Sequence, residues 1–282
     1  MTSAPDAEPV PSRLHIGLQR AGSTYLYELL ASHPDVALVR KGVSFYATSF
    51  ERGLEWYQTL FPPRGIRIDS SPDYFFRGRI VAPRIKAATA RTSPRFVLLL
   101  RNPIDYTASR FLLHRRTKGL RKRFGATPRD LEALVRDHPE YLDESRYAGL
   151  LEQHWFAHFQ PTQFCIVLFE DFVADPPAAT EVVLRFFGLR PYPLSAPPSS
   201  RNATLRHPFL HAVKRAIVRR PGLRAAVRGN PLVQRAYDRL LVGRVEKLTV
   251  TQRAWLRDLL AADVARLKRL LANSLAPWRD FQ

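Results

Sequence analysis

The residues best suited to chemistry lie near the N-terminus, where an apolar run, Leu14–Leu18, leads into a tight turn anchored by Gly22. The hydroxyl residues Ser23 and Thr24 follow this glycine and precede a helical sequence that starts at Tyr25. Backbone N–H groups in such a turn and at a helix N-terminus point toward a bound anion, and the helix dipole favours negative charge there. We therefore predict an anion-binding turn between a strand and a helix.

The spacing of this turn is similar to that of the nucleotide P-loop, Gly-x-x-x-x-Gly-Lys-Ser/Thr. Ser23 stands where that motif has the lysine that reaches the terminal phosphates, and Arg20 is the nearby cation. Guanidinium groups donate forked hydrogen bonds to phosphate and sulfate and stay charged at any relevant pH. The turn therefore indicates a site for a phosphate or sulfate group, without the lysine of ordinary metal-assisted nucleotide hydrolysis.

A second anion site is predicted at the end of another apolar run, residues 95–100. Arg101 follows this run, Pro103 suits the first turn of a helix, and Ser109 lies further along that helix. An arginine and a hydroxyl in this arrangement can bind one phosphate from two sides. Each charge-assisted hydrogen bond of this kind contributes about 1.5–3 kcal/mol.

Short runs rich in Val, Ile and Leu alternate with helical stretches along the chain. This alternation predicts an α/β fold, a three-layer sandwich with a central, mostly parallel sheet of about five strands. The two strand-to-helix turns then lie at the same carboxyl edge of the sheet, where open α/β sheets bind ligands. The predicted strands are Leu14–Leu18, Val36–Val39, Ile66–Asp69, Phe96–Arg101 and Phe164–Phe169.

The chain of 282 residues is long enough for one large α/β domain. We predict a disordered lead over residues 1–12 and a single domain over 13–282, which ends in a capped amphipathic helix, Thr249–Leu271. Within this domain, residues 113–145 are expected to form a basic, exposed and mobile insertion that could reach an acidic acceptor, with a merely solvated loop as the alternative. Residues 190–248 are expected to form a segment that covers the substrates.

The formal net charge of +19 is carried mostly by arginine, since only seven of the 44 basic residues are lysine. Such a balance indicates a polyanionic partner, which from charge alone is a nucleotide, a nucleic acid, an acidic glycan or an anionic lipid, and arginines on solvated faces are the alternative. The partners that we expect are a small-molecule nucleotide and an acidic glycan, lipid or metabolite, without specific recognition of nucleic acid. The basic stretches 209–219 and 223–242 allow peripheral membrane contact, and solvated basic faces are the alternative.

A single cysteine excludes a disulfide framework, and the N-terminus shows no signal-peptide pattern, so a cytoplasmic protein is expected.

The two anion motifs and several shorter ones resemble the sulfotransferases that use 3′-phosphoadenosine-5′-phosphosulfate, in particular their bacterial and heparan-sulfate branch. The resemblance follows the chain in order from His15 to Trp278. Its motifs are Gln-Arg-Ala-Gly-Ser-Thr-Tyr-Leu from Gln19, His33-Pro34, Ser71-Pro72-Asp73-Tyr74-Phe75, Arg101-Asn102-Pro103 with Ser109, Glu170-Asp171-Phe172, Phe186-Phe187-Gly188-Leu189 and Arg201-Asn202-Ala203.

This resemblance implies transfer of a sulfuryl group from the adenosine donor to a hydroxyl or amine of an unidentified acceptor, with a glycan and a lipid as candidates. It implies no metal, in keeping with the absence of a ligand cluster from the sequence. It assigns the 5′-phosphosulfate to Arg20, Ala21, Gly22, Ser23 and Thr24, the 3′-phosphate to Arg101 and Ser109, and the adenine to stacking on Tyr25.

Sulfuryl transfer resembles loose phosphoryl transfer, in which negative charge grows on the leaving phosphate oxygen. Catalysis therefore needs cations and N–H groups at the leaving side, where Arg20 is the predicted catalytic cation. The family usually has lysine at this position. A guanidinium can stabilise the leaving phosphate, but it cannot act as a general acid at neutral pH.

The acceptor side departs further from the family pattern. The motif Lys-Glu-x-His-Phe-Phe, whose glutamate is a usual base in the heparan branch, begins here at Lys41, with Gly42 in place of glutamate and Ser44 in place of histidine. In the next motif, Glu-Lys-Ser/Thr-Pro, Asp69 retains a carboxylate. We predict Asp69 as the catalytic base, with a turn cap as its alternative role, and His114 as the second candidate, with a surface histidine as the alternative. Lys41 is a candidate for the missing cationic partner.

Two other classes of protein remain open from the sequence. A P-loop nucleotide kinase is one, although Ser23 occupies the lysine position of its motif. A non-catalytic relative that binds polyanions is the other, because the altered acceptor motifs fit a loss of activity.

Overall fold

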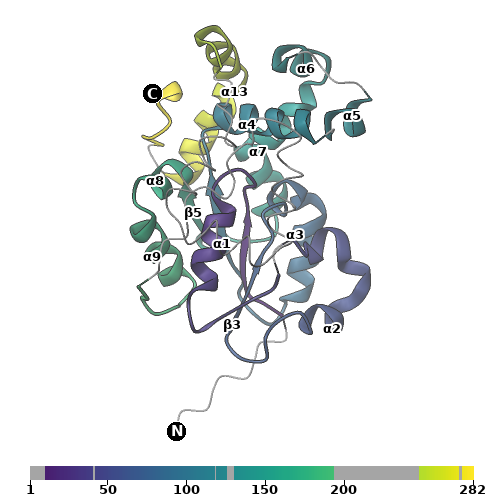
Figure 1. Cartoon of the computed structure of the whole chain (residues 1–282), viewed down its shortest axis with the longest axis vertical. Helices are drawn as coiled ribbons and strands as arrows, with labels where there is room; N and C mark the ends of the chain where they lie inside the picture. Colours follow the sequence, from purple (N-terminus) through teal and green to yellow (C-terminus); the bar gives the residue numbers. More distant parts are fainter. Residues whose placement is uncertain (1–9, 41, 118, 126–129, 194–247, 273–274) are drawn as a thin grey trace, which may run out of the picture.

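A five-stranded parallel sheet forms the centre of the protein in the computed structural model, and helices cover both of its faces (Figure 1). The structure describes residues 10–40, 42–117, 119–125, 130–193, 248–272 and 275–282. The strands are β1 (Arg13–Gly17), β2 (Val36–Leu38), β3 (Ile66–Ser70), β4 (Arg95–Leu100) and β5 (Phe164–Leu168). They lie in the order β2-β3-β1-β4-β5, and all neighbouring strands are parallel.

The strands form where the chain is most continuously apolar. In β4, the five residues that follow Arg95 are all buried. Such runs are typical of parallel strands, because helices cover both faces of a parallel sheet. Each predicted strand overlaps an observed one with ends that differ by at most one residue. The predicted α/β class with a central parallel sheet is therefore confirmed.

Crossover connections place helices on opposite faces of the sheet. The connection from β1 to β2 contains α1 (Ser23–Ala31), and that from β3 to β4 contains α3 (Gly78–Ala88). These connections run in opposite directions across the sheet, and right-handed crossovers then put α1 and α3 on opposite faces. The other elements before residue 187 are η1 (Phe45–Ser49), η2 (Phe50–Arg52), α2 (Gly53–Gln58), η3 (Phe75–Arg77), α4 (Pro103–Arg116), α5 (Gly119–Phe124), α6 (Leu131–Asp137), η4 (Pro139–Ser145), α7 (Tyr147–Leu150), η5 (Leu151–Trp155), η6 (Pro161–Gln163), α8 (Phe169–Ala174) and α9 (Pro176–Phe186).

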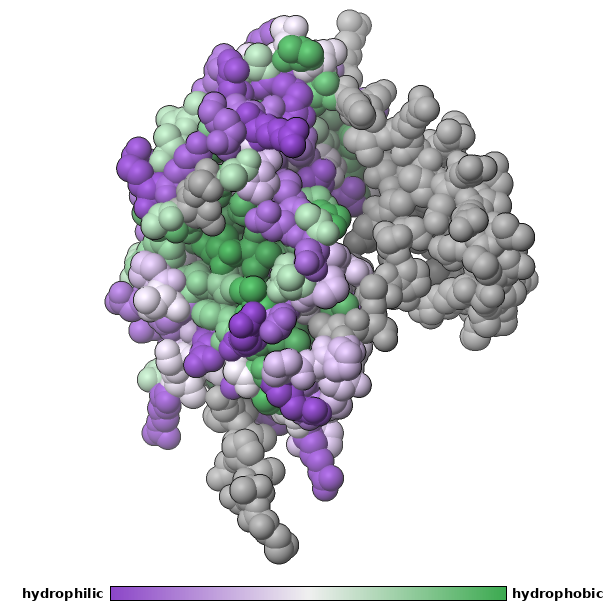
Figure 2. Space-filling model, turned by 90° about the vertical axis from the view of Figure 1, so that its left-hand side faces the viewer, coloured by the Kyte–Doolittle hydropathy of each residue, from purple (hydrophilic) through white to green (hydrophobic). Residues whose placement is uncertain are grey.

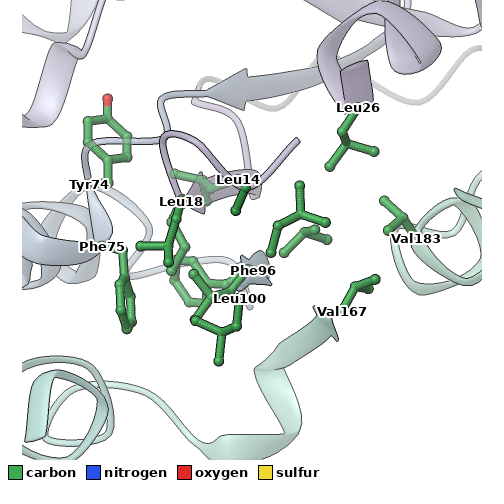
Figure 3. Packing of buried hydrophobic residues seen from close by; sticks show 14 of the residues in the cluster. Leu14, Leu18, Leu26, Tyr74, Phe75, Phe96, Leu100, Val167 and Val183 are labelled. Atoms are coloured by element: carbon green, nitrogen blue, oxygen red, sulfur yellow. The ribbon is translucent and has the colours of Figure 1, made fainter. Parts of the chain in front are cut away.

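Side chains from both helical layers meet on the sheet in one large apolar core. Figure 3 shows Leu26 of α1 and Val183 of α9 gathered near Val167 of β5, while Phe75 lies on the other side with Leu100 of β4. These residues are buried. Burial of a side chain of this size contributes about 1.5–3 kcal/mol, so the sheet is a rigid support for the loops at its edges.

The strand order places a ligand-binding position at the centre of the sheet. The chain leaves β1 toward β2 on one side and reaches β4 on the other side. In open α/β sheets, ligands bind outside the carboxyl ends of strands at the point where the order reverses. Here that point lies at the ends of β1 and β4, where both predicted anion motifs begin.

The basic segment 113–145 is more ordered than the sequence predicted. It contains α5, α6 and η4, and Glu144 pairs with both Arg110 (2.5 Å) and Arg123 (2.8 Å). The reason is that its apolar residues are buried in a second core, which they form with α4 and the C-terminal helix. That core consists of Ile104, Phe111, Leu112, Leu120, Leu131, Leu134, Val135, Tyr141, Leu142, Leu256 and Leu260.

The C-terminal part of the fold is the helix α13 (Val250–Leu271), followed by the short turn η7 (Arg279–Phe281). Thr249 and Gln252 form a capping box at its start, as the sequence predicted. Within the described residues, no helix combines the length and apolar character needed to cross a membrane. The predicted lead before residue 10, the motif at Arg201, the basic stretches 209–219 and 223–242, and most of the predicted covering segment 190–248 lie outside the described residues.

One face of the molecule is partly apolar. Figure 2 shows hydrophobic residues gathered in the middle of the face that α8 and α9 border, with hydrophilic residues around them. Val173 of α8 and Val182 of α9 are exposed.

Candidate active site

The predicted anion-binding turn joins β1 to α1 at the carboxyl edge of the sheet. Gly22 precedes α1 with a left-handed backbone (φ 85°), and its carbonyl accepts hydrogen bonds from the N–H groups of Tyr25 (2.8 Å) and Leu26 (3.0 Å). The hydroxyl of Ser23 donates to the carbonyl of Leu18 and closes the turn. The first N–H groups of a helix have no partner within that helix, so the turn presents amide donors at the start of α1.

Gly22 is the residue of this turn that we expect to tolerate substitution least. An added Cβ atom would lie 3.1 Å from the ring of Phe172 and 3.3 Å from that of Phe169. A left-handed backbone costs an L-residue about 1–2 kcal/mol, so Gly22→Ala should lower the free energy of unfolding by at least that amount. Gly42 has a similar φ of 88° with open space around its Cβ position, so Gly42→Ala is the control. Urea titrations measure both losses, and an equal loss would show that the contact with Phe172 adds nothing.

The two predicted anion motifs meet in space. Arg20 Nε donates to Ser109 Oγ at 3.0 Å, across 89 residues of sequence. Arg101 Nη1 donates to the backbone carbonyl of Arg20 at 3.0 Å, across 81 residues. The structure therefore places the arginine–hydroxyl pair of the second motif directly against the turn of the first.

Arg101 is half-buried where the chain leaves β4. Its guanidinium lies 5.0 Å from the ring centre of Phe169, and the hydroxyl of Tyr147 donates to its carbonyl at 3.0 Å. Two guanidinium groups, those of Arg101 and Arg20, therefore share one small region. Like charges this close repel each other, and a bound phosphate or sulfate favours both of them.

Tyr25, the residue predicted to stack on adenine, is half-buried in the first turn of α1. Its ring meets that of Phe172 edge-on, with a centre-to-centre distance of 5.4 Å and an interplanar angle of 66°. Phe172 also lies next to Gly22. Aromatic rings from α1 and α8 therefore border the turn, and the stacking of Tyr25 on adenine stays a prediction.

Asp69, the predicted base, is fully buried at the end of β3. Its carboxylate accepts hydrogen bonds from the hydroxyls of Tyr57 (2.5 Å), Ser71 (2.6 Å) and Tyr74 (2.8 Å). Burial raises the pKa of Asp69 above its ordinary value of 3.8, and the three hydroxyl donors oppose that shift. Proton transfer by Asp69 stays a prediction. Its contacts also give it a structural role, because Tyr57 ties the end of β3 to α2, and Tyr74 in turn accepts a hydrogen bond from the N–H of Tyr46 in η1.

We expect Asp69→Asn to destabilise the fold by about 1–3 kcal/mol, because the amide nitrogen would face hydroxyls that now donate to an oxygen. Since the pKa of Asp69 is higher in the folded than in the unfolded chain, the stability that this carboxyl contributes falls as the pH rises above 3.8. The loss caused by Asp69→Asn should therefore be smaller at neutral than at acid pH. Urea unfolding at several pH values tests both points, with the exposed Asp137→Asn as control. Unchanged stability would contradict the anchoring role.

Asp73 is a carboxylate in this region that the sequence analysis did not select. It accepts a hydrogen bond from Ser44 Oγ at 2.6 Å and lies 3.5 Å from Arg77 Nε. Its side chain is 13% exposed, whereas Asp69 is not exposed at all. Ser44 has a left-handed backbone (φ 46°). The turn after β3 therefore holds an accessible carboxylate against the segment in which the family motif has its glutamate and histidine.

His114, the second candidate base, lies on α4 beyond Ser109. Its ring meets that of Tyr141 in an edge-on arrangement at 6.2 Å. Burial lowers the pKa of His114, and the nearby Arg110 lowers it further, so the ring is neutral at neutral pH. The contacts of His114 are with the second core, and its catalytic role stays a prediction. Lys41 lies outside the described residues.

A match between this chain and a family model identifies the family that the motifs indicate. A family model described as a sulfotransferase domain matches residues 13–207. The chain belongs to the sulfotransferase family. The matched residues include β1 to β5, both anion motifs and Asp73.

Two of the curated relatives of this sulfotransferase-family chain are human proteins. It is 28% identical to heparan sulfate glucosamine 3-O-sulfotransferase 6 over 76% of its own length and 60% of that protein. It is also 28% identical to heparan sulfate glucosamine 3-O-sulfotransferase 3B1, over 67% of its own length and 48% of that protein. The chain thus spans about half to three fifths of these relatives.

A solved structure has the same fold over nearly the whole chain. The sulfotransferase from Alicyclobacillus acidocaldarius superposes with a TM-score of 0.64 and 19% sequence identity, and the match covers 96% of this chain and 99% of that one. At this identity, the likeness shows the sulfotransferase fold alone.

The sequence does not indicate the roles of several residues around the site, because these roles depend on contacts between distant segments. Asn102 and Glu170 belong to two of the sequence motifs, but nothing in their spacing indicates that the N–H of Asn102 donates to the carboxylate of Glu170. Tyr147 carries no motif signal. The spacing of Asp73 from the strand end was the one available sign, since it places a carboxylate near the ligand edge.

Proposed function

We propose that this member of the sulfotransferase family transfers the sulfuryl group of 3′-phosphoadenosine-5′-phosphosulfate to a hydroxyl group of an acidic glycan. The observation that carries the proposal is the contact between the two anion motifs, in which Arg20 reaches Ser109 and Arg101 reaches the backbone of the turn. A donor with an anionic group at each end of an adenosine needs two such sites on one sheet edge.

The residues present fit this donor. The amide groups of residues 21–24 at the start of α1 suit the 5′-phosphosulfate, because helix N-termini favour anions. Arg101 and Ser109 suit the 3′-phosphate, and Arg20 lies between the two positions, with its backbone in the turn and its side chain on Ser109. The rings of Tyr25 and Phe172 offer an apolar border for the adenine.

The bound donor supplies an activated sulfuryl group, whose bond to the bridging phosphate oxygen breaks as a bond to the acceptor oxygen forms. Arg20 and the N–H groups of the turn stabilise the negative charge that grows on the departing phosphate. Because the guanidinium keeps its proton, Arg20 acts through charge and hydrogen bonding alone.

We assign the base that takes the acceptor proton to Asp73 instead of Asp69. Asp73 is partly exposed, and Ser44 holds one of its oxygens at 2.6 Å. Asp69 is buried and accepts three hydrogen bonds from its own chain. A base must come within hydrogen-bond reach of the incoming hydroxyl, and only the carboxylate of Asp73 is open to such a group.

The net charge of the chain and the names of its relatives both favour an acidic glycan as the acceptor. The formal net charge of +19 favours a polyanionic partner. The two human relatives are named for 3-O-sulfotransfer to glucosamine in heparan sulfate. A hydroxyl on an already acidic sugar chain matches both observations.

Two measurements test this function. Adenosine 3′,5′-bisphosphate should raise the melting temperature, since a ligand that binds the folded state stabilises it, whereas ATP with Mg²⁺ should not. A transfer assay with labelled donor should then sulfate heparan-type glycans in preference to lipids and phenolic metabolites. Stabilisation by ATP–Mg²⁺ alone would favour a kinase-like enzyme. Salt-sensitive glycan binding without any effect of the bisphosphate would favour a non-catalytic binder.

A further inference from the structure

The last residues of the chain lie against the start of α4, the helix that carries Ser109. Figure 1 shows the C-terminus beside α8 and α13. Trp278 is fully buried there, and Lys268 of α13 donates to the carbonyl of Phe281 at 2.6 Å. These residues lie beyond the part of the chain, 13–207, that the family model matches.

Asn102, the residue after Arg101, is held from the C-terminal side. Its Oδ1 caps α4 by accepting from the N–H of Ile104 at 3.0 Å. Its Nδ2 donates to Asp280 Oδ2 at 2.8 Å. Arg253 of α13 fixes that carboxylate with bonds to both oxygens, at 2.5 and 2.9 Å.

Glu170 connects the same residue to Trp278. The backbone N–H of Asn102 donates to Glu170 Oε1 at 2.9 Å, and the indole N–H of Trp278 donates to Glu170 Oε2 at 2.9 Å. The ring of Trp278 also lies 6.2 Å from that of Tyr147, whose hydroxyl bonds the carbonyl of Arg101. The carbonyl and the N–H of the single peptide group that joins Arg101 to Asn102 are therefore both bonded to neighbours of the C-terminal segment.

A helix cap by itself does not need these contacts. An asparagine caps a helix with its side-chain oxygen alone, and a solvent-exposed cap leaves its amide nitrogen to water. Here Asp280 orients that nitrogen, and a second carboxylate, from Glu170, takes the backbone N–H. The carboxylates of Glu170 and Asp280, which both bond to Asn102, therefore fix the direction in which α4 starts. They also fix the backbone position of Arg101.

We propose that the C-terminal segment 275–282 positions Arg101 and α4 for the 3′-phosphate of the donor, with Trp278 and Asp280 as the positioning residues. The proposal rests on the proposed function, because it assumes that Arg101 and Ser109 bind that phosphate. It adds a part of the donor site that neither anion motif contains.

The test compares two nucleotides that differ only in the 3′-phosphate. Adenosine 3′,5′-bisphosphate and adenosine 5′-monophosphate are titrated calorimetrically against the full chain and the variants Asp280→Asn and Trp278→Phe. Each variant should weaken the bisphosphate at least fivefold and leave the monophosphate within twofold. Asp280→Asn removes a negative charge, which by itself would strengthen binding of an anion, so a loss cannot come from net charge.

The control is Arg279→Gln, which changes an exposed charge in the same turn and should alter neither affinity. In an Arg101→Met background, Asp280→Asn should weaken the bisphosphate less than it does in the unmodified chain, because part of its effect acts through Arg101. If Asp280→Asn does not fold, Trp278→Phe answers the same question, because it keeps an aromatic ring while it removes the N–H donor and the five-membered ring of the indole.

Equal weakening of both nucleotides, or an additive effect in the Arg101→Met background, would show a general structural role and overturn the proposal. If the unmodified chain fails to prefer the bisphosphate over the monophosphate, the proposed function itself fails. The two failures are thus distinguishable.

Discussion

Replacing Arg101 with methionine should weaken the binding of adenosine 3′,5′-bisphosphate by about 2–3 kcal/mol, roughly 30- to 150-fold. Arg101 is half-buried and lies against Phe169, so little water is available to replace its hydrogen bonds to a phosphate. Methionine keeps most of the apolar stem and removes the charge. Isothermal titration calorimetry at fixed salt measures the change in affinity.

Arg95→Met is the matched control for this prediction. Arg95 is the first residue of β4, at the opposite end of the strand from Arg101, and its guanidinium is exposed and bonds the carbonyl of Phe186. The Arg95→Met variant removes the same charge at the amino edge of the sheet, away from the proposed site of the nucleotide. A similar loss of affinity in both variants would mean that only the net charge matters and would remove Arg101 from the site.

Replacing Asp73 with asparagine should lower kcat by about 10²- to 10⁴-fold, the range that general base catalysis contributes. The asparagine oxygen can still accept the hydrogen bond from Ser44, so the turn keeps its shape while the proton acceptor is lost. The KM for the donor should stay within about twofold, because Asp73 is not part of the anion motifs. Initial rates over a range of donor and acceptor concentrations separate the two constants.

Asp69→Asn supplies the contrast to Asp73→Asn. Asp73→Asn should keep a near-native melting temperature with little activity, since its ion pair with Arg77 is partly exposed and contributes little to stability. Asp69→Asn should show the reverse, a lower melting temperature with activity retained while the protein is folded. If folded Asp69→Asn is inactive and Asp73→Asn is not, the base is Asp69, as the sequence predicted.

The arrangement of strands and helices follows from local patterns that the sequence displays. Continuous apolar runs such as 96–100 are typical of strands in a parallel sheet covered on both faces, and Gly22 followed by Ser23 and Thr24 indicates a tight turn before a helix. The capping box at Thr249 is equally local. For this reason, the sequence alone predicted the five strands, the anion-binding turn and the C-terminal helix.

The sequence determined less about the segment 113–145. Its charges are frequent and its apolar residues are spaced over several short helices, so no single periodicity stands out. Whether such residues are buried depends on a partner surface, and that surface comes from α4 and α13. An exposed insertion was therefore predicted where the structure has a second core.

Only the tertiary structure decided which residues of the site meet. Arg20 bonds Ser109 and Arg101 bonds the turn because β1 and β4 are neighbours in the sheet, although the bonded residues are 89 and 81 positions apart in the sequence. The same holds for the two carboxylates at the end of β3. Tyr57 of α2, together with Ser71 and Tyr74 of the following turn, encloses Asp69, whereas Asp73 stays partly exposed. Residue type and spacing determine which chemistry is available, whereas burial and the approach of distant segments decide which group carries it out.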